Sequence, residues 1–313
     1  MSRAFVFPGQ GSQSVGMGRA LADSFAEARE VFEEVDEALK QKLSTLMFEG
    51  PEDELTLTEN AQPALMAVSM AVMRVLEGQG GLELAKAADF VAGHSLGEYS
   101  ALTAAGSLSL ADAARLLKIR GRAMQEAVPV GAGAMAALLG LSLEDAAAVA
   151  AEAAEGQVCT AANDNADGQV VVSGHKEAVE RAIGIAKGKG ARRAVLLPVS
   201  APFHCPLMQP AAERMDEALR EVDIRTPAVP LVANVRAAAV SDPDEIRSLL
   251  VEQVTGMVRW RESVLYMKEQ GVSELVELGA GKVLSGLVRR IDRSMSARSV
   301  QGPEDIEAFL ASL

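Results

Sequence analysis

The segment Gly93-His94-Ser95-Leu96-Gly97 places a serine between two glycines, directly after the apolar run Phe90-Val91-Ala92. This is the G-x-S-x-G spacing of a nucleophile elbow, in which a sharp strand-to-helix turn lifts the serine above a sheet. At such a turn the N–H of Leu96 and the positive end of the next helix would stabilise an oxyanion. Chance spacing in a chain with 27 glycines is the alternative, but the strand before and the helix after favour the elbow. The pattern therefore predicts acyl transfer or hydrolysis through an acyl-serine.

A serine hydroxyl is a weak nucleophile and needs a base within hydrogen-bond reach, and the chain has three histidines. Neighbouring side chains leave a sharp turn in different directions, so we expect His94 to position or pack rather than act as the base. His175 stands at the start of a predicted helix, where a cap or surface role is expected. His204 lies in a loop bracketed by Pro202 and Pro206, which would hold its ring in place. We therefore choose His204 as the general base.

A hydrolase-type triad would add an acid between the serine and the histidine in chain order. The acids in that interval include Asp164 and Asp167, which we expect in a loop without the context of a strand end. A main-chain carbonyl is the alternative third group, because it can accept the imidazole N–H and select the tautomer.

The glycine-rich turn Phe7-Pro8-Gly9-Gln10-Gly11-Ser12-Gln13 follows the first predicted strand. It fails as a dinucleotide fingerprint, since Ser14 stands where the third glycine belongs and Asp23 falls within a helix. A tight loop that points the backbone N–H of Gln10 at the same oxyanion as Leu96 is the alternative use, and two donors would complete the hole.

Cations at Lys118, Arg120 and Arg122 belong to a predicted helix downstream of the serine. Such charges usually form a solvated helix face. An enzyme that selects a diacid thioester would instead need a guanidinium, because arginine makes the bidentate carboxylate contact that lysine cannot.

Composition limits the function classes. The chain has 313 residues, of which 49% are hydrophobic, so it can bury a large core. Its 30 basic and 43 acidic residues leave a net charge of −13, which argues against general nucleic-acid binding and against an anionic membrane surface. Cys159 and Cys205 are too few for a disulfide framework, and no secretory leader is recognisable, so we expect a cytoplasmic protein. No apolar run approaches a membrane span, and no ligand spacing predicts a metal site.

Strand-like and helix-like segments alternate along the chain, which is typical of an α/β fold. We expect helices over 18–39, 63–77 and 110–128, and a boundary at the Gly131-Ala132-Gly133 linker. The next segments read strand 134–141, helix 143–155, strands 158–162 and 169–173, helix 176–188 and strand 193–199. This β-α-β-β-α-β order is ferredoxin-like. Later elements are a helix over 206–221, a strand over 229–235, a helix over 246–255, a strand over 275–278 and a helix over 283–291. We therefore predict a discontinuous catalytic domain, 1–130 and 200–313, with a small subdomain at 131–199.

Taken together, the motifs resemble the malonyl-CoA:acyl carrier protein transacylase family of dissociated bacterial fatty acid synthesis. The resemblance rests on the two glycine-rich turns at 7–13 and 93–98, Arg120 and Phe203-His204. It extends over nearly the full length, through Gln62-Pro63-Ala64, Gly168-Gln169-Val170-Val171, Val232-Ala233-Asn234-Val235, Gln253, Val258-Arg259-Trp260 and Gly279-Ala280-Gly281-Lys282-Val283-Leu284.

The resemblance implies an α/β-hydrolase-like core with a parallel sheet and an inserted ferredoxin-like subdomain. In it Ser95 would attack the malonyl thioester, His204 would act as base and then acid, and Gln10 and Leu96 would supply oxyanion N–H groups. Arg120 would bind the malonyl carboxylate, and the main-chain carbonyl of Gln253 would orient His204. Family members work by a ping-pong mechanism without a metal or cofactor, and pass the acyl group from malonyl-CoA to the phosphopantetheine thiol of acyl carrier protein.

Further expectations concern selectivity and partners. A branched acyl group would crowd Phe203 and Leu96, which favours malonyl, although several relatives carry serine in place of Phe203. Asn163 and Asn165 are expected to line the pantetheine channel, unless they serve a loop turn only. We expect a monomer and a local docking patch for the acidic carrier at Lys187, Lys189, Arg192 and Arg193, although cations at a helix end also suit the dipole alone. The rival functions are a serine hydrolase that uses the same elbow and a carrier-binding scaffold with an inactive site.

Overall fold

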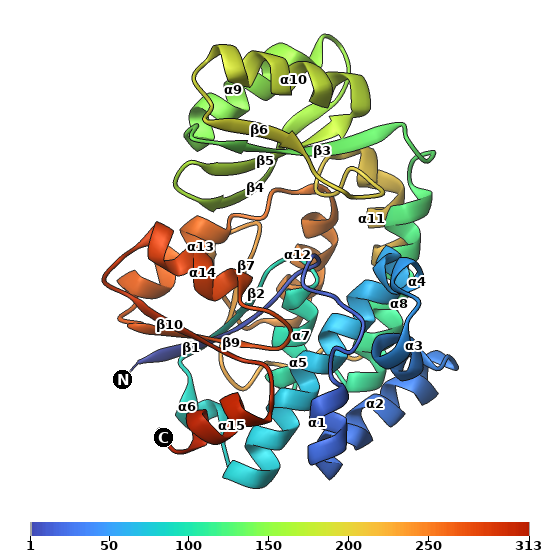
Figure 1. The fold of residues 1–313 in the computed structure, drawn as a ribbon, viewed down its shortest axis with the longest axis vertical. Helices are drawn as coiled ribbons and strands as arrows, with labels where there is room; N and C mark the ends of the chain where they lie inside the picture. Colours follow the sequence, from blue (N-terminus) through green and yellow to red (C-terminus); the bar gives the residue numbers. More distant parts are fainter. Residues whose placement is uncertain (1, 313) are drawn as a thin grey trace.

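A computed structural model describes residues 2–312 and contains two sheets (Figure 1). The larger sheet has six strands in the order β10-β9-β1-β2-β7-β8, and the smaller has four in the order β4-β5-β3-β6. Neighbours in the larger sheet run parallel except for β7 and β8, whereas the smaller sheet is antiparallel. The α/β class expected from the sequence is confirmed, with one parallel-rich and one antiparallel sheet.

The strands of the larger sheet are β1 (Arg3–Phe7), β2 (Phe90–Gly93), β7 (Leu231–Ala233), β8 (Ala238–Val240), β9 (Glu274–Leu278) and β10 (Ser296–Val300). Those of the smaller sheet are β3 (Gly133–Leu139), β4 (Cys159–Ala166), β5 (Gln169–His175) and β6 (Arg193–Leu196). The helices are α1 (Arg19–Ser24), α2 (Ala26–Leu39), α3 (Leu43–Glu49), α4 (Glu52–Thr56), α5 (Thr58–Gly80), α6 (Leu84–Ala87), α7 (Gly97–Ala104), α8 (Leu110–Glu126), α9 (Leu143–Ala154), α10 (Lys176–Gly188), the 3₁₀ turn η1 (Pro206–Met208), α11 (Gln209–Arg220), α12 (Pro243–Thr255), α13 (Trp260–Glu269), α14 (Val283–Ile291) and α15 (Pro303–Leu310).

Alternating side chains of β1 pack into two different core clusters on opposite faces of the larger sheet. Phe5 and Phe7 join the cluster formed with α2, α5 and α8, whereas Ala4 and Val6 join the cluster formed with α13 and α14. This period of two is what a strand buried on both faces requires, and it makes the larger part a three-layer α/β/α structure. Figure 1 shows α13 and α14 on the side of the sheet away from α5.

The central strands β1, β2 and β7 are parallel neighbours, so their carboxyl ends meet at one edge of the sheet. The turn after β1, the elbow after β2 and the residue after β7, Asn234, therefore lie together. In open α/β sheets this edge is where ligands bind.

The smaller sheet covers that edge (Figure 1). Helices α9 and α10 pack on its outer face, while Met135, Ala162 and Val171 belong to the same core cluster as the larger part. The order β3-α9-β4-β5-α10-β6 matches the β-α-β-β-α-β pattern read from the sequence. We propose that residues 131–199 form a separate subdomain.

Strand β4 contacts the larger part directly and corrects one expectation. Asp164, which we expected in a loop, lies within β4, and its N–H donates to Val258 O at 2.9 Å. Its side chain pairs with Arg261 at 2.9 Å and is buried. The expected strand ended at residue 162 because polar residues follow, yet those residues pair with β5 and with Val258.

Other boundaries also differ from the expectations. The helix expected over 18–39 is divided into α1 and α2 at Phe25, whose backbone is extended (φ −130°). The elements α3, α4, α6, β8, α13, β10 and α15 were not predicted. Strand β10 is an edge strand with the sequence Ser-Ala-Arg-Ser-Val, which lacks the apolar run typical of a buried strand.

Candidate active site

Ser95 follows β2 in a turn that the backbone strongly constrains. Its φ is 55°, in the left-handed region that few residues other than glycine adopt. A Cβ atom on Gly93 would lie 1.9 Å from the carbonyl of Gly97, and one on Gly97 would lie 2.3 Å from Phe7 O. Both glycines of the motif are therefore required by backbone contacts, as the elbow geometry predicts.

His204 lies against Ser95 although the two are 109 positions apart, with its Nε2 atom 2.8 Å from Ser95 Oγ. Its Nδ1 atom lies 2.9 Å from the carbonyl oxygen of Gln253 on α12. Since a carbonyl can only accept, Nδ1 carries the proton and Nε2 is left as the acceptor for the serine hydroxyl. The pair has the geometry of a nucleophile and its general base.

The environment of His204 keeps its ring neutral. Burial, and next the positive charge of Arg120, lower the pKa of His204 to about 3. A neutral imidazole can take the serine proton, and its orientation comes from a backbone carbonyl rather than from a carboxylate. Asp164 pairs with Arg261 instead, and Asp167 lies in the turn after β4.

Two residues that line the same cavity as Ser95 have free backbone N–H groups. They are Leu96, the first residue after the serine, and Gln10 in the turn after β1. Neither N–H donates a hydrogen bond to any group in the part of the chain that the structure describes, whereas the side chain of Gln10 reaches Thr58 Oγ1 at 3.3 Å. Two free donors beside a nucleophile can hold the negative charge of a tetrahedral intermediate.

Arg120 is 1% exposed and points from α8 toward the serine. Its Nη2 atom lies 3.0 Å from Ser95 Oγ and 2.8 Å from Gln253 Oε1, and its Nη1 atom lies 2.7 Å from Gln62 Oε1. All three acceptors are uncharged, and among residues 2–312 no carboxylate forms an ion pair with this guanidinium. The Nε atom has no partner. A buried and unpaired cation is costly, so the site is suited to receive an anion.

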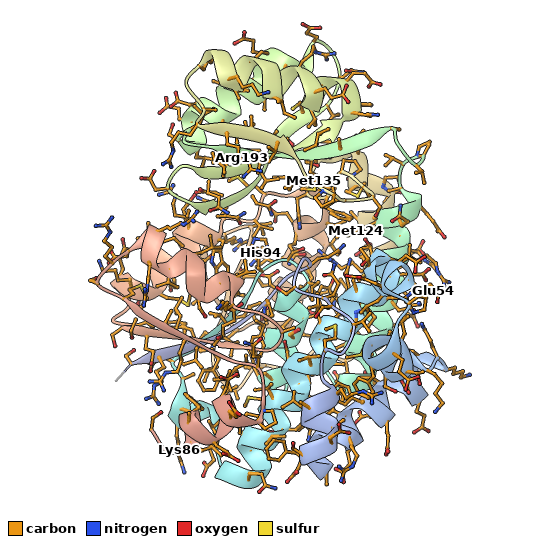
Figure 2. The ribbon with its side chains drawn as sticks, viewed as in Figure 1. Glu54, Lys86, His94, Met124, Met135 and Arg193 are labelled. Atoms are coloured by element: carbon orange, nitrogen blue, oxygen red, sulfur yellow. The ribbon has the colours of Figure 1, made fainter. Side chains whose placement is uncertain are left out.

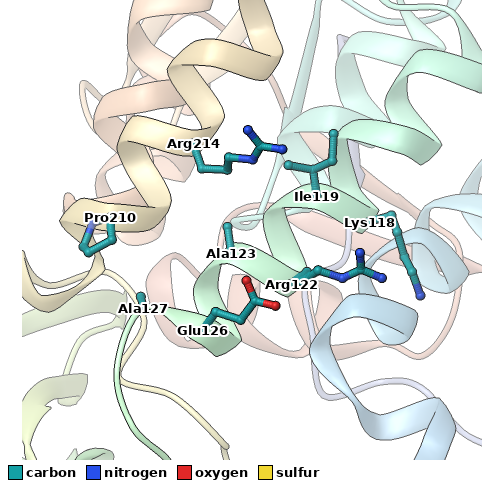
Figure 3. Close-up of a pocket in the computed structure, with 8 residues that line it drawn as sticks. All are labelled: Lys118, Ile119, Arg122, Ala123, Glu126, Ala127, Pro210 and Arg214. Carbon is teal, nitrogen blue, oxygen red and sulfur yellow. The ribbon is translucent and has the colours of Figure 1, made fainter.

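The neighbouring cations of α8 lie on its outer face. Lys118 and Arg122 pair with Glu59 at 3.1 and 3.2 Å and line an open hollow of about 360 Å³ together with Arg214 of α11 (Figure 3). The solvated-face interpretation therefore applies to Arg122 and not to Arg120, whereas Lys118 is partly buried and also donates to Asn60 Oδ1 at 2.7 Å.

The cavity at this edge has a volume of about 580 Å³ and lies between the two sheets. Figure 2 shows His94, Met124 and Met135 in this region, where the two parts of the molecule meet. Its lining includes eight of the residues singled out from the sequence: Gln10, Ser95, Leu96, Arg120, Asn163, Asn165, Phe203 and His204. Gln253 lies behind them and is fully buried.

The remaining histidines have other contacts. His94 is partly buried, with Nε2 2.8 Å from Asn165 Oδ1 and its ring against Trp260, and its removal from solvent lowers its pKa. His175 precedes α10, and its Nδ1 accepts the N–H of Val158 at 2.9 Å. Asn163 and Asn165 lie on β4 rather than in the loop that the sequence suggested.

Three residues of the site were not singled out by sequence reasoning. Asn234 accepts the N–H of Ser95 at 2.8 Å, and Glu98 accepts the N–H of Asn234 at 2.6 Å and a hydrogen bond from the side chain of Gln253. Burial raises the pKa of Glu98 to about 8. The third is Gln62, beside Arg120. Segments containing Gln62, Glu98 and Asn234 carried the family resemblance, which was the available signal.

No helix among residues 2–312 is long and apolar enough to cross a membrane. Within the same residues, no group of three or more His, Cys, Asp or Glu side chains is placed to hold a metal ion.

Comparisons with known proteins agree with this geometry. The acyl transferase domain family matches residues 4–301. The malonyl CoA-acyl carrier protein transacylase of Escherichia coli (strain K12) is 49% identical over 307 residues, which is 98% of each chain. A crystal structure of an acyl-carrier-protein-S-malonyltransferase from Bartonella henselae is 59% identical with a TM-score of 0.97, over 100% of this chain and 99% of that one. A structure described as a type II PKS acyl-carrier protein in complex with its malonyl-transacylase is 43% identical with a TM-score of 0.96, over 100% of both chains.

Proposed function

The chain belongs to the acyl transferase domain family, as its motifs indicated, and we propose that it transfers malonyl from malonyl-CoA to the phosphopantetheine thiol of acyl carrier protein. This reaction would supply extender units for fatty acid synthesis. The catalysis uses side chains and backbone N–H groups, with no cofactor.

In the first half-reaction, Ser95 Oγ attacks the thioester carbonyl while its proton passes to His204 Nε2. The N–H groups of Leu96 and Gln10 hold the oxyanion. When the C–S bond breaks, the proton on Nε2 goes to the departing sulfur. Coenzyme A then leaves, and malonyl remains as an ester on Ser95.

In the second half-reaction, the carrier thiol gives its proton to His204 Nε2 and its sulfur attacks the ester carbonyl. The same two N–H groups hold the second oxyanion. Collapse of this intermediate breaks the bond to Ser95 Oγ, which recovers the proton, and malonyl leaves on the carrier. Asn163, Asn165 and Phe203 line the approach to the serine in this scheme.

Arg120 selects the acyl group by binding its free carboxylate. The guanidinium is already within 3.0 Å of Ser95 Oγ, so a three-carbon diacid esterified there would place its distal carboxylate beside the cation. An acetyl group would leave the buried charge without a partner.

The observation that carries the proposal is the convergence of Ser95 on both His204 and Arg120, at 2.8 and 3.0 Å. Intact-protein mass spectrometry after mixing with malonyl-CoA tests it. We expect a malonyl adduct that is absent in Ser95→Ala and weak in Arg120→Ala or with acetyl-CoA. Rapid release of free malonate, with no adduct and no thiol acceptor, would instead identify a hydrolase.

The docking surface for the carrier is proposed at Lys187, Lys189, Arg192 and Arg193, all of them exposed. Lys189 contacts Glu152 at 2.6 Å, an exposed pair that contributes little and leaves the patch cationic. We expect Lys189→Glu combined with Arg193→Glu to raise the KM for the carrier and to spare acyl-serine formation. Lys86→Glu, at the opposite end of the molecule from Arg193 in Figure 2, is the control. An unchanged KM for the carrier would show that these four residues do not form the docking surface.

We propose further that the enzyme acts as a monomer in the cytoplasm.

A further inference from the structure

We propose that Gln62 is a specificity-determining positioning residue, because its neutral carboxamide orients Arg120 without compensating its charge. The inference rests on the proposed function and deepens it, since it concerns how the same site prefers an acyl group with a free carboxylate.

Gln62 lies on α5 and is 1% exposed. Its Oε1 atom accepts a hydrogen bond from Arg120 Nη1 at 2.7 Å, and Gln253 Oε1 accepts one from Nη2 at 2.8 Å. Ser95 Oγ accepts a third. A guanidinium has five N–H donors, so two remain available, one of them on the unpartnered Nε. The amides thus fix the direction of the cation and leave both its charge and part of its hydrogen-bonding capacity to a ligand.

The two glutamines differ in what surrounds their NH₂ groups. Gln253 Nε2 donates to Ser95 O at 2.9 Å and also to a carboxylate oxygen of Glu98. A glutamate at position 253 would therefore lose both of these donated hydrogen bonds and place an oxygen against Ser95 O and the carboxyl group of Glu98. Gln62 Nε2, by contrast, meets only the thioether of Met124 at 3.8 Å, which is a weak acceptor.

Position 62 is therefore where a carboxylate would fit at small cost and would pair directly with Arg120. Such a pair would compensate the buried charge, and the carboxylate of an incoming malonyl group would meet a like charge in the same pocket. The presence of glutamine at this position keeps the cation open to substrate.

The test compares Gln62→Glu, which adds the charge, with Gln62→Leu, which removes the acceptor and adds none. The kcat and KM for acyl-serine formation are measured with malonyl-CoA and with acetyl-CoA. For Gln62→Glu we expect kcat/KM with malonyl-CoA to fall on the order of 100-fold, mainly through KM, because a buried charge pair is displaced. The acetyl-CoA value should change by less than about threefold, since acetyl makes no contact that depends on this charge.

For Gln62→Leu we expect kcat/KM to fall by less than about tenfold with both malonyl-CoA and acetyl-CoA, because one neutral hydrogen bond is lost. The preference for malonyl-CoA should be retained. If Gln62 had a purely structural role, each variant would lower kcat/KM with malonyl-CoA and with acetyl-CoA by the same factor. That outcome, or a wild-type malonyl-to-acetyl ratio in Gln62→Glu, would overturn the inference. If Gln62→Glu does not fold by circular dichroism, Gln62→Asp carries the same charge on a shorter side chain and the same expectation applies. Failure of the wild-type chain to form a malonyl adduct would instead contradict the proposed function.

Discussion

The side-chain oxygen of Asn234 accepts the backbone N–H of Ser95 at 2.8 Å, although the two residues are 139 positions apart. The same carboxamide donates through Nδ2 to Gly93 O at 2.7 Å. Asn234 thus joins both sides of the nucleophile turn from the end of the neighbouring strand β7, and it holds in place a serine with a strained φ.

Replacement of Asn234 by aspartate should therefore impair the turn while leaving its shape nearly unchanged. Aspartate keeps an acceptor for the N–H of Ser95 but sets an oxygen against Gly93 O. We expect a loss of about 1–3 kcal/mol in the free energy of unfolding, as for a buried polar group left without its partner. The acylation rate should fall as well, measured as adduct formation with malonyl-CoA. Wild-type stability and rate in Asn234→Asp would contradict this role.

Alanine at position 93 should be far more damaging than at a typical glycine. Its Cβ would lie 1.9 Å from backbone atoms of Gly97, so the turn must open, at a cost of about 3 kcal/mol. Gly286 on α14 is the matched control, because nothing lies within 4 Å of a Cβ there. Gly286→Ala should raise the free energy of unfolding by about 0.5–1 kcal/mol. Urea denaturation measures the free energy of unfolding of both variants. Equal changes in Gly93→Ala and Gly286→Ala would show that the backbone contacts at the turn do not limit residue 93 to glycine.

The acylation half-reaction should have an acid limb far below the usual range for histidine. The neutral imidazole is the base, and burial followed by the charge of Arg120 lowers the pKa of His204 to about 3 from 6.5. The kcat/KM with malonyl-CoA should therefore stay constant as the pH falls through 6.5 and decline only toward 3.

The same shift makes a prediction for stability. The folded protein binds this proton less readily than the unfolded chain. The contribution of His204 to the free energy of unfolding is therefore present above pH 6.5 and is lost as the pH falls toward 3.

In Arg120→Ala the acid limb of the kcat/KM profile should move to higher pH, because a nearby positive charge is removed. A wild-type limb near 6.5 would be inconsistent with the buried ring.

Asn165 and Asn163 should differ when replaced by alanine. The Oδ1 atom of Asn165 accepts from Nε2 of the partly buried His94 at 2.8 Å, whereas the Asn163 carboxamide makes no hydrogen bond within residues 2–312. Asn165→Ala should lower the free energy of unfolding by about 1 kcal/mol, since a partly buried donor loses its partner. Asn163→Ala should cost less and act mainly on the KM for the thioester substrate. Equal losses in urea denaturation would argue against the His94 contact.

Local sequence was sufficient for those parts of the site that depend on neighbours in the chain. The elbow around Ser95 could be predicted because its glycines meet the backbone of the same turn. The ferredoxin-like order could be predicted because hydrophobic periodicity reports local structure. His204 was reached by elimination among three histidines, and Arg120 through the resemblance, since nothing local separates it from Lys118 and Arg122.

Asn234, Glu98 and Gln62 could not be given roles in this way. Each acts through atoms that lie far along the chain or on another helix, and an asparagine, glutamate or glutamine has no local pattern that reports such a partner. Asp164 was misplaced for the same reason, because its strand bridges to Val258 and its side chain forms an ion pair with Arg261, both far along the chain.

Spacing and residue type alone established the nucleophile turn, the α/β class and the family, because these follow from short-range sterics and from motifs contiguous in sequence. Folding added the charge environment: the burial of Arg120 beside its exposed neighbour Arg122, the contact between the imidazole and the Gln253 carbonyl that the resemblance had implied, and the amides that surround the guanidinium. These depend on distances between segments that only packing brings together. Burial then sets the strength of these electrostatic interactions, because charges and dipoles interact more strongly in the low-dielectric interior than in water.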